Sequence, residues 1–130
     1  MYAKELIQRY EAGERDFKGV VLDDEDLEAG SNLQKSDLRN TDLSDVDLSE
    51  VNLSDANLQY ADLSRAILFQ ANLENADLDY ADLTDADLEQ ANLANAQTRM
   101  TIFCNTTMPD GSVRDDGCIE GEEDEEIDDE

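Results

Sequence analysis

Leucine recurs at every fifth residue through the middle of this chain, and this period constrains the fold more than any other feature. Thirteen leucines keep it: Leu33, Leu38, Leu43, Leu48, Leu53, Leu58, Leu63, Leu68, Leu73, Leu78, Leu83, Leu88 and Leu93. A period of five matches neither the α-helix nor the two-residue alternation of a strand. It fits a coil of short sides, each burying one leucine before the chain turns a corner. The repeat therefore predicts a solenoid whose coils contact only their neighbours.

Two other positions of each pentad are restricted. The residue two before leucine is small, usually alanine, and the residue just before leucine is almost always Asp or Asn, as in Asn52 and Asp62. One large and one small side chain per side can fill a narrow coil to the packing density of a protein interior. An Asp or Asn side chain can bond the nearby backbone and support the turn that follows.

This pattern, from about Thr41 to Ala96, resembles the pentapeptide-repeat family, and the segment from Phe103 to Ser112 looks like the C-terminal segment of many cyanobacterial members. The resemblance implies an all-β solenoid, a right-handed quadrilateral β-helix with four pentads per coil and with leucine and the small residue inside. Because Phe17 continues the spacing at one end and Phe103 at the other, we expect about four coils.

The N-terminal segment is predicted to close one end of this solenoid. Residues 2–12 read as an amphipathic helix with Tyr2, Leu6 and Tyr10 on one face, and Gly13 stands at a helix stop position. We therefore expect residues 1–13 to form a short capping α-helix and residues 14–103 to form the β-helix. Leu27 and Leu33 are six residues apart, so a one-residue bulge is predicted near residues 29–30.

The C-terminal segment is predicted to close the other end. Residues 108–111 read as a type I turn, which would place Cys104 opposite Cys118 in a hairpin cap over residues 104–120. A disulfide between them would stabilise the fold by about 3 kcal/mol in the entropic treatment of a 15-residue loop. A cytosolic location would favour free thiols instead, so both states stay open. Residues 121–130 are almost all acidic, and we expect a disordered tail.

The charge of the chain limits its partners. The formal net charge is −26, which repels nucleic acid and anionic membrane surfaces and attracts basic partners or cations. No apolar run is long enough for a membrane span, and the first residues lack a secretory apolar region. We therefore predict a cytoplasmic protein, a monomer or weakly self-associating, that binds a protein partner and contacts neither membrane nor nucleic acid directly.

Catalytic chemistry finds no support in the sequence. The chain has no histidine, and Cys104 and Cys118 lack the CxxC pairs of zinc sites. Phosphate-binding loops and nucleophile triads are also missing, and a continuous leucine core leaves no substrate cavity. We interpret the chain as a non-enzyme without a cofactor or a metal site.

Residues twenty apart should stack in columns, and two columns suggest contact sites. Ile67 stands between Asp47 and Asp87, and Phe69 lies beside it, so both are expected to point outward. Such apolar groups on a charged surface indicate a partner or self-association site, or else local packing under the C-terminal segment. Tyr60 and Tyr80 form a second column, which is either an aromatic ladder that stiffens the coil or a recognition patch.

Charged columns allow further interpretations. Asp42, Asp62 and Asp82 could be solvated turn residues or, less simply, calcium ligands. The column of Asp45, Arg65 and Asp85 suggests an ion sandwich.

Three functions remain in order of preference. The first is a non-catalytic interaction or scaffold module that presents a rigid acidic rod. The second is a DNA mimic that binds a basic DNA-processing enzyme such as DNA gyrase, which the resemblance to quinolone-resistance members suggests. The third is calcium binding on the aspartate columns.

Overall fold

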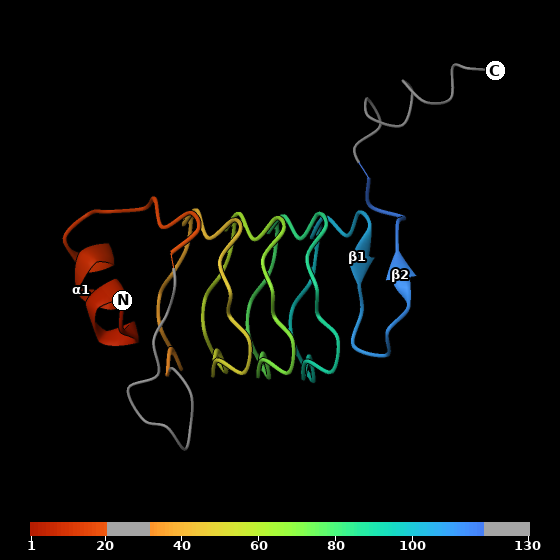
Figure 1. Ribbon diagram of the computed structural model, residues 1–130, viewed down its shortest axis with the longest axis horizontal. Coiled ribbons are helices and arrows are strands. Elements are labelled where there is room, and N and C mark those ends of the chain that lie inside the picture. Colours follow the sequence, from red (N-terminus) through yellow and green to blue (C-terminus); the bar gives the residue numbers. More distant parts are fainter. Residues whose placement is uncertain (21–31, 119–130) are drawn as a thin grey trace.

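The computed structural model describes residues 1–20 and 32–118 of the 130-residue chain. It shows a stack of coils with the helix α1 (Ala3–Glu11) at one end and a two-stranded hairpin at the other (Figure 1). The hairpin consists of β1 (Thr106–Thr107) and β2 (Val113–Arg114). Between these ends the sides of the coils are too short to form named strands, because each side contributes one bridging residue before the chain turns.

Parallel bridges join residues twenty positions apart and define four sides. Side 1 contains Asn32, Asn52, Asn72 and Asn92; side 2 contains Asp37, Asn57, Asp77 and Gln97; side 3 contains Asp42, Asp62, Asp82 and Ile102; side 4 contains Asp47, Ile67, Asp87 and Thr107. Backbone hydrogen bonds accompany the bridges, as from the Leu53 N–H to the Asn72 carbonyl at 2.8 Å. The twenty-residue column rule therefore describes real neighbours for these residues.

Each corner is a tight turn with a left-handed residue. The Ala56 N–H donates to the Leu53 carbonyl at 3.1 Å, and Asp55 between them has a φ of 61°. The same positive φ recurs at every fifth residue from Lys35 to Asn105. A positive φ at the third turn residue is the geometry of a type II turn, which normally favours glycine. Here the ladder of hydrogen bonds on both flanks holds non-glycine residues in it.

The core is a column of leucines with alanines between them. Every leucine of the repeat from Leu33 to Leu88 is fully buried, whereas Leu93 at the C-terminal end is only partly buried. The same cluster includes Leu6 from α1 together with Phe17 and Phe103. One continuous core therefore runs from the helix to the last coil.

The helix α1 packs through fewer residues than the sequence suggested. Ala3 and Leu6 are buried and Tyr10 is half-buried, but Tyr2 is 51% exposed. Tyr2 precedes the helix in an extended conformation, so its ring does not follow the helical face that the sequence pattern predicted for it. Gly13 ends the helix with a φ of 107° and donates its N–H to the Tyr10 carbonyl at 2.9 Å.

The register of the first coil differs from the one that a single inserted residue would give. A one-residue insertion would put Phe17 over Leu38, but the Phe17 N–H donates to the Asp42 carbonyl at 2.8 Å, so Phe17 lies over Leu43. Sixteen positions separate Phe17 from Leu33, whereas two sides need ten, so the excess is a whole pentad plus one residue. The bulge proposed at residues 29–30 and the tail at 121–130 lie outside the described residues.

The chain turns back on itself after the last coil. Thr107 pairs with Val113 in the antiparallel hairpin, and the turn between them closes with the Gly111 N–H on the Met108 carbonyl at 2.8 Å. Gly111 has a φ of 87°, which explains glycine there. Gly117 then donates to the Phe103 carbonyl at 3.0 Å, and a Cβ at this position would lie 2.7 Å from the Phe103 nitrogen.

Helices that could cross a membrane are not found in the described part of the chain, because none has the necessary length and apolar character.

Candidate functional site

The Asp or Asn before each leucine supports the following turn. Asn52 Oδ1 accepts the Ser54 N–H at 3.0 Å, and Asp62 Oδ1 accepts both the N–H and the hydroxyl of Ser64 at 3.0 and 2.6 Å. The same backbone bond occurs at every Asp or Asn of this position from Asn32 to Asn92. These oxygens are engaged in local turn bonds, which matches the simpler interpretation of the aspartate columns.

Ile67 breaks this rule on side 4. Its column neighbours are Asp47 and Asp87, and its side chain is 42% exposed. An isoleucine side chain cannot accept a hydrogen bond, and within the described chain no hydrogen bond is made by the Phe69 N–H. Phe69 itself is half-buried rather than fully outward as expected, so it contributes to packing as well as to the surface. We call Ile67 and Phe69 the side-4 patch.

Tyr60 and Tyr80 form a stacked pair at the corner between sides 2 and 3. Their ring centroids are 4.8 Å apart with an angle of 4° between the planes, while the side chains stay 56% and 47% exposed. Met100, twenty residues after Tyr80, takes the same corner position and is 70% exposed. Met100 was not among the residues expected from the sequence, although the twenty-residue spacing places it in this column. We call these three residues the corner stripe.

The two apolar features do not form one surface. Side 3, with Asp62 at its centre, lies between the corner of Tyr60 and the side of Ile67. The four residues singled out from the sequence therefore make two separate candidates: the side-4 patch, with an exposed isoleucine and a half-buried phenylalanine, and the exposed pair of tyrosines.

The rod carries several surface ion pairs, but the predicted sandwich of Asp45, Arg65 and Asp85 does not form as expected. Arg65 Nε donates to Asp45 Oδ1 at 2.9 Å, and this bond lowers the pKa of Asp45. Asp85 instead accepts the side-chain amide of Asn105 at 2.7 Å. The predicted sandwich is therefore a pair, because Arg65 directs its guanidinium toward one neighbour.

Asp79 and Arg99 form a second carboxylate–guanidinium pair, which was not among the pairs expected from the sequence. Asp79 is almost fully buried and accepts the Arg99 backbone N–H at 2.8 Å and the guanidinium Nη2 at 2.7 Å. The side-chain hydrogen bond from Arg99 lowers the pKa of Asp79. The residues are twenty apart, so the column rule again supplied a signal.

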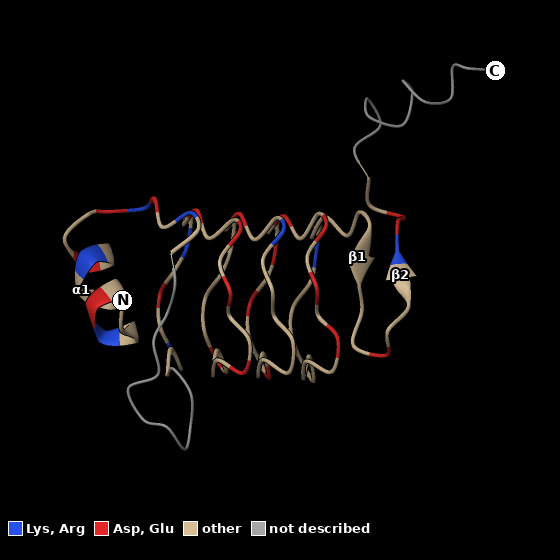
Figure 2. Cartoon of the chain, in the orientation of Figure 1, with Lys and Arg blue, Asp and Glu red and all other residues tan. Residues whose placement is uncertain are grey.

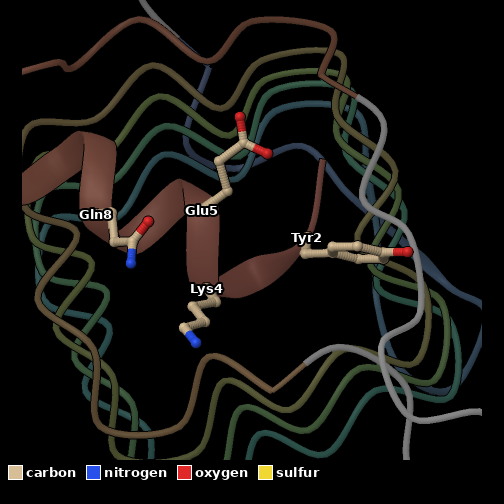
Figure 3. Close-up of a pocket in the computed structure, with 4 residues that line it drawn as sticks. All are labelled: Tyr2, Lys4, Glu5 and Gln8. Carbon is tan, nitrogen blue, oxygen red and sulfur yellow. The ribbon is translucent and has the colours of Figure 1, made fainter.

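Acidic residues far outnumber basic ones in this chain. Figure 2 shows many acidic positions and a few basic ones along the stacked coils, and α1 also carries both signs. A hollow beside α1, lined by Tyr2, Lys4, Glu5 and Gln8, has a volume of about 420 Å³ and opens to solvent (Figure 3). Its open form and scattered polar groups differ from the enclosed, mostly apolar pockets that usually bind small molecules.

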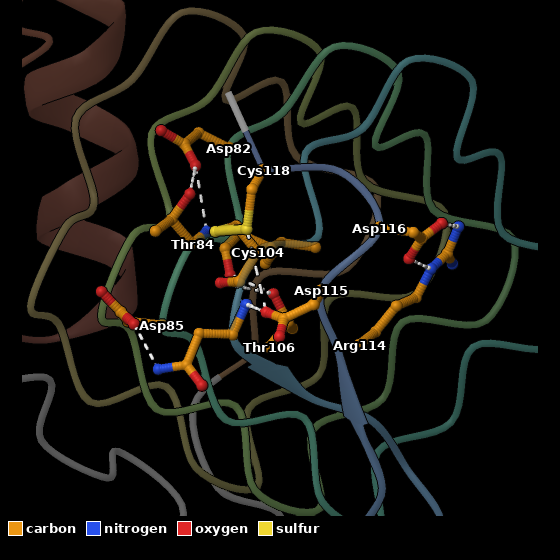
Figure 4. Close-up of a disulfide and its surroundings, with 11 residues drawn as sticks. Asp82, Thr84, Asp85, Cys104, Thr106, Arg114, Asp115, Asp116 and Cys118 are labelled. Carbon is orange, nitrogen blue, oxygen red and sulfur yellow. Dashed lines mark hydrogen bonds and ion pairs between the residues drawn. A yellow bond between two sulfur atoms is a disulfide. The ribbon is translucent and has the colours of Figure 1, made fainter. Parts of the chain in front are cut away.

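The C-terminal cysteines are joined in a disulfide (Figure 4). Their Cα atoms are 4.5 Å apart, and Asp115 beside them accepts the Asn105 N–H at 2.8 Å. The Arg114 guanidinium lies 4.2 Å from the centroid of the Phe103 ring. The bridge therefore fastens the returning chain to the last coil next to a cation–π contact.

The repeat and its stacked coils are shared with known proteins. Residues 31–70 and 71–108 match the profile described as Pentapeptide repeats, with eight copies. A pentapeptide repeat protein from Nostoc Pcc 7120 is 43% identical, with 81% of this chain and 79% of that chain covered and a TM-score of 0.68.

Two further solved structures are more distant. A pentapeptide repeat protein from the Arabidopsis thaliana thylakoid lumen is 27% identical over 78% of this chain and 67% of that one, with a TM-score of 0.47. QnrB1, a plasmid-mediated fluoroquinolone resistance protein, is 12% identical over 70% and 61%, with a TM-score of 0.38. No curated protein matches the chain. The profile and the Nostoc structure together establish that this chain belongs to the pentapeptide repeat family, whose members form right-handed β-helices.

Proposed function

We propose that this chain is a non-catalytic protein-interaction module, a rigid acidic rod of about four coils capped by α1 and the C-terminal hairpin. Its partner is a protein in the cytoplasm, and the side-4 patch is the contact site. The observation that carries this proposal is the exposed Ile67 at the position just before leucine, where every other pentad from Asn32 to Asn92 has Asp or Asn.

Local stability does not account for isoleucine at this position. Asp or Asn there would accept the Phe69 N–H, as the equivalent residues do along the rod, whereas Ile67 forfeits that bond. It also exposes 42% of an aliphatic side chain between two carboxylates. Positions where a sequence breaks its own local rule without a stability gain are often functional. A buried contact in a complex would supply the missing gain.

The DNA-mimic alternative rests on charge. The net charge of −26 suits a basic DNA-binding partner. About four coils at 4.8 Å make a rod of roughly 20 Å. That length corresponds to only about six base pairs at 3.4 Å each. This alternative also leaves the side-4 patch without a role.

Affinity capture with paired variants separates these functions. The bait would be the wild-type chain, Ile67→Asp, or Val113→Asp as a matched control, because Val113 is an exposed aliphatic residue of the hairpin. Ile67→Asp is preferable to a change at Phe69, which is half-buried. We expect a partner retained by wild type and Val113→Asp and reduced at least tenfold with Ile67→Asp.

Two results would count against the proposal. Equal capture by all three baits would remove the side-4 patch as the site. Capture of nucleic-acid-binding proteins only, equal for all baits and released by moderate salt, would favour the acidic surface and the DNA-mimic alternative.

A further inference from the structure

The last coil is covered on only two of its four sides. On side 4, β2 lies antiparallel to β1, and next to side 3 Gly117 bonds the Phe103 carbonyl. Apart from the turn bond from the Thr101 N–H to the Thr98 carbonyl, sides 1 and 2 of this coil, residues 91–100, receive no backbone bond from any later residue that the structure describes. We call residues 91–100 the open edge.

Backbone groups at the open edge lack the partners that their equivalents have one coil earlier. The N–H groups of Leu73, Asn75, Leu78 and Tyr80 donate to carbonyls of the last coil at 2.8 to 2.9 Å. Their counterparts twenty residues later are Leu93, Asn95, Thr98 and Met100, and these N–H groups have no partner among the described residues. The carbonyls of Ala91 and Ala96 likewise accept no hydrogen bond from a described residue, whereas the equivalent carbonyls of Ala71 and Ala76 each accept one. Six backbone groups thus point along the axis of the rod in strand-pairing geometry.

The core is also unfinished at this edge. Leu93 and Ala96 are only partly buried, whereas Leu73 and Ala76 below them are fully buried. Thr98 is exposed at the position where the previous coil buries a leucine. Another layer with a small residue and a leucine at the repeat spacing would bury these side chains.

Charge does not protect the open edge. From Ala91 to Met108 the sequence contains one charged residue, Arg99, in a chain whose net charge is −26. Exposed strand edges are normally blocked by charges, proline, bulges or a covering segment. Within the open edge Arg99 is the one charged residue and there is no proline, so this edge carries far less charge than the rest of the rod.

We propose that the open edge binds an extended segment of a partner protein, which adds a strand to sides 1 and 2. Two sides correspond to about ten residues, with alanine and leucine at the repeat spacing over Ala91 and Leu93. Acids on the coil beneath, Glu74 and Asp77, favour lysine or arginine at the outward positions of that segment. This surface is distinct from the side-4 patch and goes beyond the proposed function.

The shape of the end selects a single strand over a second rod. Because β2 and Gly117 already lie over sides 4 and 3, they form a step about one strand spacing, roughly 4.8 Å, above sides 1 and 2. The flat end of another coil would meet this step before it reached the open edge. An extended segment is one strand thick and fills the step, as in other complexes formed by strand addition.

The test uses the full chain and a synthetic probe. The probe is a ten-residue peptide of two pentads, with alanine and leucine at the repeat spacing and lysine after each leucine; a scrambled peptide is the control. Amide hydrogen exchange of the ¹⁵N-labelled protein is followed by NMR at physiological salt. We expect exchange at Leu93, Asn95, Thr98 and Met100 to be fast in the free protein and to slow at least tenfold with the probe alone.

Two variants sharpen the test. Thr98→Pro removes an N–H that has no partner within the described chain, so the thermal midpoint should stay near that of wild type while probe affinity falls at least tenfold. Ile67→Asp, on the side-4 patch, should bind the probe like wild type, so that failure of one proposal does not imply failure of the other.

Each contrary result has a meaning. Binding of the scrambled peptide with equal affinity, or binding unaffected by Thr98→Pro, would reduce the effect to charge and overturn the proposal. The four amides could instead exchange slowly in the dilute free protein and lose this protection when the chain is cut after Cys118. That result would assign the edge to the chain's own C-terminal residues and would also overturn the proposal. Protection that grows with protein concentration would assign it to a second copy, with the same consequence.

Discussion

The side chain before each leucine has a defined structural task, and Ile67 is informative because it cannot perform it. We expect Ile67→Asn to raise the free energy of unfolding by about 1 kcal/mol, the usual net gain of one hydrogen bond, because the new side-chain amide oxygen could accept the Phe69 N–H. Urea denaturation monitored by circular dichroism would measure it. Ile67→Val, which offers no acceptor, is the control. If asparagine is no more stabilising than valine at this position, the missing turn bond does not limit stability.

Asp79 gives a pH-dependent prediction. Its pKa is lowered in the folded protein, chiefly by the hydrogen bond from the Arg99 side chain. A lowered folded pKa means that the charge stabilises the fold above the unfolded pKa of about 3.9 and that this contribution is lost as the pH falls through the folded value. Asp79→Asn should therefore have a lower thermal midpoint than wild type at pH 7.

The difference between the two midpoints should begin to shrink below about pH 4, where Asp79 of the unfolded chain takes up a proton, and should disappear as the pH falls through the lowered pKa of the folded protein. Thermal scans from pH 3 to pH 7 would measure it. A difference that is constant with pH would show that the Asp79 charge is not the stabilising feature. Asp85→Asn is a matched control, because Asp85 is an exposed aspartate whose contact is a neutral asparagine amide.

Among the elements, the hairpin was easier to predict than the first coil. The turn before Gly111 and the symmetric placement of Cys104 and Cys118 involve residues close together in the sequence, so their pairing could be predicted without knowing how the coils stack. The position of Phe17 was harder to predict, because five extra residues leave the five-residue spacing of the apolar residues unchanged. The spacing alone therefore cannot say whether Phe17 lies over Leu38 or Leu43, and the hydrogen bonds between coils decide this.

The disulfide makes the hairpin the element most sensitive to redox conditions. Replacing both Cys104 and Cys118 with serine should lower the free energy of unfolding by about 3 kcal/mol, the entropic value for a 15-residue loop. Urea denaturation with and without a thiol reductant would measure this, and the reductant should lower wild-type stability but leave the double variant unchanged. Equal stability of wild type and variant without reductant would show that the bridge does not hold the returning chain.

On the scale of the whole molecule, much of the candidate surface could be predicted from the twenty-residue spacing of stacked residues. Once residues twenty apart are stacked, the Tyr60–Tyr80 pair and the exposed Ile67 are readable from the sequence. The half-burial of Phe69 and the open edge were not, because they depend on how side chains settle and on where the chain stops coiling. The repeat thus determines the fold, whereas the candidate functional residues lie where the sequence departs from the repeat.

The stack also predicts how stability is distributed along the rod. Each coil contacts only its neighbours, so a residue with coils on both sides should matter more than one at an end. Leu63→Ala, in the middle and fully buried, should cost about 3 to 5 kcal/mol through lost burial and a cavity. Leu93→Ala, at the partly buried open edge, should cost roughly 1 kcal/mol, because less surface is lost and the site can relax.

Urea denaturation of both variants at the same protein concentration would measure the difference. Equal costs would mean that Leu93 is as well covered in solution as Leu63, and hence that some segment lies over the open edge even in the free protein. A much larger cost for Leu63 would support an end that is unfinished in the free chain. Since the core is continuous from Leu6 to Phe103, unfolding should still follow a single transition in both variants, with the end variant differing in midpoint rather than in cooperativity.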